Sequence, residues 1–401
     1  MPGSNSPNRE GVHAELDPKL SRPPPDPDSG EVEDEAQEPS FFESPRRLVQ
    51  SAVFVVLLVV GIYFLLPKLL EDEDATAKLA QGEPVWITIA LGFSIAMFGA
   101  YVALFRGVVG ESVKLRWKDS YDITMAGLAA TRLFSAGGAG GIVLTYWALR
   151  KAGMPQKETA ARMVTFLVLV YAVYMLALLI DGILLRTGVL GGDAPPGLTI
   201  VPAAFAGGVI VVFLLLAVVP GDLERRFSHA SQKRLWGRIA RRVATVPSTA
   251  AVGTRGALAF VREPSRGGLA VLGAIGFWAA QIGILWASFK AFDVEVPLSV
   301  VVQGFFVGML ANLIPLPGGV GGVDAGMLGA FALFDVHGPI FAAVLVYRVF
   351  AFWLPIPPGV VAFLHLRKTV RGWEETRGSA TSGPEATRTR PGKPITSESK
   401  V

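Results

Sequence analysis

Long runs of apolar residues alternate with short polar segments along most of this chain, and this pattern predicts an all-α polytopic membrane protein. A run of about 20 apolar residues is long enough to cross the hydrocarbon core of a bilayer as a helix. Runs of this kind predict about six full spans, at 48–66, 85–105, 160–185, 199–219, 269–290 and 340–366.

Two further apolar segments, 120–149 and 298–334, are each interrupted by a glycine run. The runs are Gly137-Gly138-Ala139-Gly140-Gly141 and Gly318-Gly319-Val320-Gly321-Gly322. Glycine weakens a helix, and irregular backbone at membrane depth is tolerated only where protein buries it or where it lines a cavity. We therefore expect two glycine-broken, re-entrant helical hairpins; hairpins that both cross the membrane twice would suit the charge pattern equally.

The basic residues of the loops predict the orientation, because Lys and Arg favour cytoplasmic loops. Arg46 and Arg47 precede the first span and place the N-terminus in the cytoplasm, and the same rule places the C-terminus there. One hairpin then enters from inside and the other from outside. The halves 48–186 and 199–366 are therefore expected to form an inverted-topology repeat, an architecture that serves alternating access in transporters.

The polar segments divide the chain into a transmembrane domain, 46–370, and two tails. The acidic, proline-rich segment 1–45 and the tail 371–401 have too few apolar residues to form a core and should be disordered. Residues 221–266 are the most basic stretch and predict an amphipathic cytoplasmic segment that lies on anionic lipid. Nothing beyond charge favours a nucleic-acid partner.

Three charged residues near the glycine runs are the strongest candidates for a functional site, because charges at membrane depth are costly and usually functional. Arg132 precedes the first run, Asp324 follows the second, and Arg348 lies within the last predicted span. Arginine binds phosphate through two parallel hydrogen bonds, and the helix N-termini after the runs attract anions. The structural alternatives are that Asp324 caps its helix and that Arg348 pairs with Asp324.

The predicted substrate site combines these charges with the backbone that the breaks expose. Its residues are Arg348, Asp324, Asn312, Arg132, Gly318, Gly319, Gly321, Gly137, Gly138 and Gly140. The residues predicted to break or hinge the helices are Pro315, Pro317, Gly141 and Gly322. Proline stops a helix, and an asparagine side chain can bond the freed backbone groups.

No motif for a catalytic or cofactor site is visible, so we expect no cofactor, no metal and no enzymatic activity. The chain has no cysteine, and its four histidines lack metal-ligand spacing. The glycine runs lack the Gly-Lys-Ser/Thr ending of a phosphate-binding loop, and no serine-hydrolase motif is present.

The second glycine run and its surroundings resemble the lysylphosphatidylglycerol synthase transmembrane region family, flippase-like membrane proteins of bacteria and archaea. The matching residues are Asn312-Leu-Ile-Pro-Leu-Pro-Gly-Gly-Val-Gly-Gly-Val-Asp324 and Tyr347-Arg348, and the resemblance covers roughly 45–370. The family commonly has Glu where this chain has Asp324. The charge pair that usually follows the first run is replaced here by Ile142, Val143 and Thr145.

The resemblance implies lipid translocation across the cytoplasmic membrane of a prokaryote. No soluble synthase domain fits in this chain, so it should not itself make lysyl-lipid. The expected partners are membrane lipids: an aminoacylated or other anionic phospholipid, or a polyprenyl-phosphate glycolipid. The alternatives are an intramembrane lipid-modifying enzyme, a scaffold that binds proteins of envelope-lipid synthesis, and a small-solute transporter.

Overall fold

The computed structural model describes seven segments of the chain. They are residues 81–110, 112–113, 115–133, 139–190, 194–218, 250–311 and 321–381. All of them belong to the larger of two compact units, residues 38–401. Several expectations fall outside the described residues: the tail at 1–45, the span at 48–66, the basic segment from 221 to 249, and the chain after 381.

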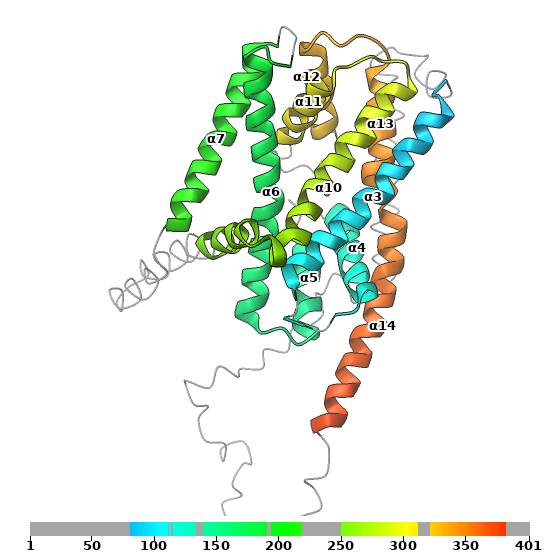
Figure 1. The fold of residues 1–401 in the computed structure, drawn as a ribbon. Helices are drawn as coiled ribbons and strands as arrows, with labels where there is room; N and C mark the ends of the chain where they lie inside the picture. The colour runs from blue at the N-terminus through cyan, green and yellow to red at the C-terminus, as the bar shows by residue number, and fades with distance from the viewer. Residues whose placement is uncertain are drawn as a thin grey trace, which may run out of the picture. The chain divides into compact units, whose positions relative to one another are not determined.

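Within the part of the chain that the structure describes, five helical stretches are long and apolar enough to cross a membrane (Figure 1). They are α3 (Pro84–Val109), α6 (Gln156–Arg186), α7 (Pro196–Val218), α10 (Pro264–Ala291) and the stretch Ile340–Glu375. The last one runs through α13 (Ile340–Arg348), the π-helical segment η5 (Val349–Trp353) and most of α14 (Ile356–Thr381). Each coincides with a predicted span, and no strand occurs among the described residues, so the all-α prediction is confirmed.

Two pairs of shorter helices occupy the glycine-broken segments. The first pair is α4 (Trp117–Leu133) and α5 (Ala139–Lys151), and the second is α11 (Leu298–Leu310) and α12 (Gly322–Leu333). At about 1.5 Å per residue, even the 17 residues of α4 extend only about 26 Å, less than the roughly 30 Å hydrocarbon core. Each segment therefore contains two short helices, as predicted, one ending before its glycine run and one beginning within it. The inverted relation of the two halves stays a prediction.

Within each hairpin the two helices pack against each other at a glycine. A Cβ atom on Gly141 would overlap the carbonyl oxygen of Gly127 and the hydroxyl of Thr131. A Cβ atom on Gly308 would lie 2.8 Å from the backbone nitrogen of Met327. Small residues let helices approach closely in a membrane, where no hydrophobic force drives them together. These glycines therefore hold each hairpin closed along its length.

The C-terminal helix extends further than its composition indicates. A disordered tail was expected from residue 371, whereas α14 continues to Thr381. The prediction was wrong at this boundary because α14 packs on α4 and α5, with Leu366 and Val370 buried. Beyond them, Lys151 Nζ of α5 lies 2.6 Å from Glu374 Oε1. Tertiary contacts thus stabilise a polar helix end that is not apolar enough to be predicted.

Helices α3 and α10 form the most extensive helix pair, and they approach most closely at two glycines. A Cβ atom on Gly273 would lie 2.7 Å from the Cα atom of Leu104 and 2.8 Å from the carbonyl oxygen of Ala100. Gly107 meets the backbone of Ala270 in the same way. The contact is backbone on backbone, so neither helix can move aside cheaply for a larger side chain.

Aromatic side chains fill the core where α10, α6 and α11 meet. The Tyr174 hydroxyl donates to the carbonyl oxygen of Phe306 at 2.8 Å, and Trp278 Nε1 donates to the carbonyl oxygen of Val170 at 2.9 Å. The rings of Tyr174 and Phe306 stack with centroids 4.8 Å apart. Aromatic groups combine large apolar area with one polar atom that must be satisfied, and here both polar atoms bind backbone. This core fixes α11 against the long spans.

Candidate functional site

An ion pair between Arg348 of α13 and Asp324 of α12 is buried inside the protein. The two residues are only 6% and 5% exposed. Arg348 Nε donates to Asp324 Oδ1, and Arg348 Nη2 donates to Oδ2 at 3.2 Å. Two parallel bonds between a guanidinium and a carboxylate are the strongest geometry for such a pair and offset much of the cost of burying both charges. The structural alternative, in which Arg348 pairs with Asp324, is thus the arrangement observed.

Asp324 also caps the N-terminus of α12. Its Oδ2 atom accepts a hydrogen bond from the backbone N–H of Gly321 at 3.0 Å. Gly321 has a φ of 82°, a conformation that glycine adopts far more readily than other residues. The alternative of a helix cap is thus also observed, and one carboxylate links the start of α12 to Arg348.

Immediately after Arg348 the α-helix changes to the π-helical segment η5. The backbone N–H of Leu354 donates to the carbonyl oxygen of Val349, five residues back, at 2.8 Å. The segment Pro355–Pro358 contains three prolines, which have no N–H to donate to the preceding turn. Regular helical bonding is therefore interrupted here, and π segments of this kind are frequent at functional sites.

Side chains from other helices bind two carbonyl oxygens of η5. Ser94 Oγ of α3 donates to the carbonyl oxygen of Phe350 at 2.9 Å. Arg132 Nη1 of α4 donates to the carbonyl oxygen of Phe352 at 2.8 Å. The interruption of the helix therefore supplies the acceptor that positions the second arginine of the site.

Arg132 and Arg348 share one aromatic ring. Their guanidinium carbons lie 5.3 Å and 5.4 Å from the centroid of Phe352. Both distances are within the range of a cation–π attraction. Among the described residues Arg132 has no carboxylate partner, whereas Arg348 has Asp324. We name Arg132, Asp324, Arg348 and Phe352 the arginine cluster. Its two guanidiniums and one carboxylate give it a net positive charge.

The arginine cluster lies in the first half of the 36-residue stretch Ile340–Glu375. Arg348 is the last residue of α13 and Phe352 lies in η5, so at about 1.5 Å per residue they lie about 12–18 Å along the helix from Ile340. Arg132 is in the last turn of α4, and Asp324 is in the first turn of α12. Both glycine-broken hairpins therefore contribute a charged residue to the same stretch at this cluster.

Comparison with known proteins identifies the family. The family described as lysylphosphatidylglycerol synthase TM region matches residues 47–359. The chain belongs to this family. A UPF0104 membrane protein of Methanothermobacter thermautotrophicus is 24% identical over 345 residues, which covers 79% of this chain and 96% of the relative. A shorter match, to a UPF0104 membrane protein of the same archaeon, is 33% identical over 86 residues, covering 21% of this chain and 26% of the relative.

As a member of this family, the chain is an integral membrane protein, and the structure brings three of its predicted site residues together. They are Arg132, Asp324 and Arg348. Gly140 and Gly141 lie in the first turn of α5, and Gly321 and Gly322 begin α12. The others, Gly137, Gly138, Asn312, Pro315, Pro317, Gly318 and Gly319, lie outside the described residues.

Sequence reasoning missed two members of the site, Phe352 and Ser94. The hydrophobic pattern of this chain predicted a full span at 340–366, whereas η5 interrupts the α-helix there. The signal was present in the three prolines of Pro355–Pro358, which predict a loss of helical hydrogen bonds just before them. That signal indicates free carbonyl oxygens but not which side chains bind them.

Proposed function

We propose that this protein moves an anionic lipid across the cytoplasmic membrane by alternating access, with the lipid phosphate held at the arginine cluster. The observation that carries the proposal is the convergence of the buried Arg348, the partly buried Arg132 and a single carboxylate on one interrupted span. A net positive charge within a membrane-spanning segment has a high energetic cost, and an anionic ligand would stabilise it. Arg132, without a carboxylate partner among the described residues, is the residue that a phosphate would bind first.

The hairpins provide the mechanism for alternating access in this proposal. Arg132 lies in the last turn of α4, before the first glycine run, and Asp324 lies in the first turn of α12, after the second. Movement of either hairpin would therefore change access to the cluster from its own side of the membrane. The acyl chains stay in the bilayer while the headgroup passes between the half-helices. Both termini lie in the cytoplasm of a prokaryotic cell, and the lipid is released chemically unchanged.

The test measures lipid movement with the purified full-length protein in proteoliposomes. Phosphatidylglycerol, lysylphosphatidylglycerol and phosphatidylcholine, each with a labelled acyl chain, are compared by accessibility of the label to a membrane-impermeant quencher. We expect Arg132→Gln to slow movement of the preferred lipid by about tenfold or more, the loss of one charge-assisted contact. Arg132→Lys, which keeps the charge but loses the two-pronged geometry, should retain part of the rate.

Arg266→Gln is the matched control, because Arg266 carries the same charge but has a side chain that is 83% exposed outside the cluster. Its rate should equal that of the unchanged protein. A folded Arg132→Gln variant with an unchanged rate would refute the phosphate contact. Absence of movement for every lipid would favour a scaffold or a small-solute carrier, and recovery of altered lipid would favour an enzyme.

A further inference from the structure

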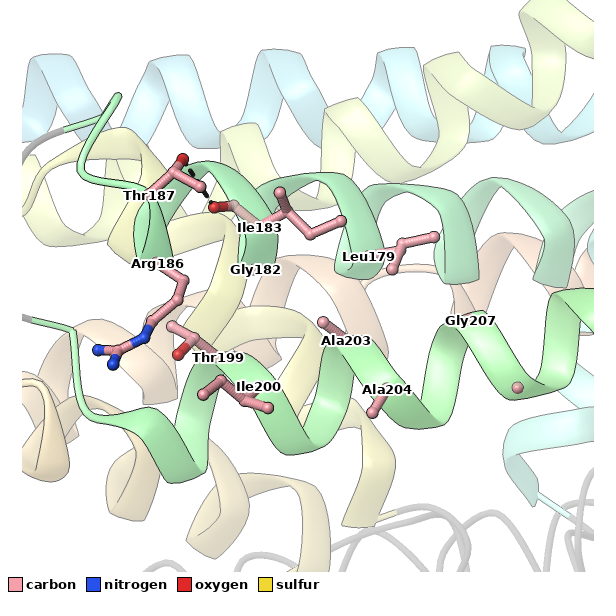
Figure 2. A pocket seen from close by; sticks show the side chains of 11 residues that line it. Leu179, Gly182, Ile183, Arg186, Thr187, Thr199, Ile200, Ala203, Ala204 and Gly207 are labelled. Atoms are coloured by element: carbon pink, nitrogen blue, oxygen red, sulfur yellow. Dashed lines mark hydrogen bonds between the residues drawn. The ribbon is translucent and has the colours of Figure 1, made fainter.

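A groove lies between α6 and α7, away from the arginine cluster (Figure 2). Its volume is about 390 Å³, within the range of small-molecule sites. Its lining comes from α6 and α7 and includes Leu179, Arg186, Thr199, Gly207 and Gly208. Apolar and small residues make up most of this lining, and Arg186 provides its only full charge.

Both helices that form the groove are long and apolar enough to cross a membrane. In a bilayer the groove would therefore face the acyl chains of the lipids. Only 17% of the most apolar part of α7 is buried, compared with 50% for α10. Glycine creates the hollow on the α7 side: a Cβ atom on Gly208 would meet nothing within 4 Å, and one on Gly207 would meet only Leu179, at 3.7 Å. No side chain of the described residues therefore fills the groove, which has room for a hydrocarbon chain.

Arg186 lies at the end of α6 and extends toward α7 beside Thr199, at the mouth of the groove (Figure 2). Its side chain is exposed, and among the described residues it has no ion-pair partner. The hydroxyls of Thr187 and Thr199 donate to carbonyl oxygens of their own helices, so they do not compete as donors. Arg186 is thus the donor available to a ligand that enters the groove.

We propose that this groove is a binding site for one membrane phospholipid, with the phosphate on the Arg186 guanidinium and an acyl chain between α6 and α7. A guanidinium at a helix end near the membrane surface matches the charge and depth of a phosphate. The apolar lining below it matches an acyl chain. This site is independent of the proposed translocation, and its occupant fills the space that the glycines of α7 leave open.

The experiment uses the purified full-length protein and phosphatidylglycerol with a photoreactive group in one acyl chain. Crosslinked residues are mapped by mass spectrometry. We expect crosslinks to α6 and α7 within the groove, reduced about tenfold by Arg186→Gln, since one charge-assisted contact is lost. Arg186→Lys should keep part of the yield, and excess inorganic phosphate should not displace the lipid, because it lacks the chain.

Two glycine variants of α7 test the apolar part. Gly208→Leu fills the groove without a backbone clash and should remove most of the crosslink. Gly197→Leu is the matched control, because Gly197 is exposed on the same helix, outside the groove, with nothing within 4 Å of its Cβ position. It should crosslink like the unchanged protein.

Equal crosslinking by Arg186→Gln and the unchanged protein would overturn the proposal, and so would equal crosslinking by diacylglycerol with the same photoreactive chain. Either result would mean that the groove binds acyl chains and that the lipid phosphate does not contribute to binding. Crosslink yield is measured separately from lipid movement, so this site and the translocation proposal can fail independently.

Discussion

Replacing Asp324 with asparagine while Arg348 is retained should destabilise the protein by about 3–5 kcal/mol, because it leaves a buried guanidinium without a counter-charge. Asparagine can still accept the hydrogen bond from the backbone N–H of Gly321, so the cap of α12 is retained. The loss of stability in Asp324→Asn therefore measures the effect of removing the negative charge, and not the effect of losing the helix cap. The measurement is the thermal unfolding of the purified protein in detergent, followed by circular dichroism.

The double variant Asp324→Asn with Arg348→Gln is the decisive control. It removes both charges and keeps polar groups of similar size, so it should recover most of the stability that either single change loses. If the losses of the two single variants simply add in the double variant, the two side chains do not act as a pair. In lipid-transport assays the double variant should stay slow despite its restored stability, because half of the proposed phosphate-binding charge is gone.

Adding a single methyl group at Gly273 should separate the two long helices at the centre of the fold. The Cβ atom of Gly273→Ala would lie 2.7 Å from the Cα atom of Leu104 in α3. Overpacking of this kind costs about 1–3 kcal/mol, and here backbone rather than a movable side chain is the obstacle. The expected result is a lower melting temperature for the purified protein.

Gly268→Ala is the matched control on the same helix, since a Cβ atom on Gly268 meets nothing within 4 Å. Alanine favours a helix over glycine by up to about 1 kcal/mol, so this variant should be as stable as the unchanged protein or more stable. The two changes are chemically identical, but only Gly273→Ala should lower the melting temperature. A shift of the same sign in both would mean that the close approach of α3 and α10 does not limit stability.

The sequence by itself determined where the membrane helices lie and where they break. Hydrophobicity along consecutive residues sets the free energy of a span, so this property is local and can be read without a fold. The paired glycine runs likewise marked both hairpins, and the cost of charge in a membrane singled out Arg132, Asp324 and Arg348. These predictions concern single segments and the energy of placing them in lipid.

Only the tertiary structure decided how these segments combine. Arg132 donates to Phe352, which is 220 residues away in the chain, and Ser94 donates to Phe350 across 256 residues. The prolines of Pro355–Pro358 showed that helical bonds are lost but not which donors replace them. The extension of α14 to Thr381 and the groove beside Arg186 depend on neighbours in the same way. A contact between distant residues depends on the packing of whole helices, which no local pattern along the chain encodes.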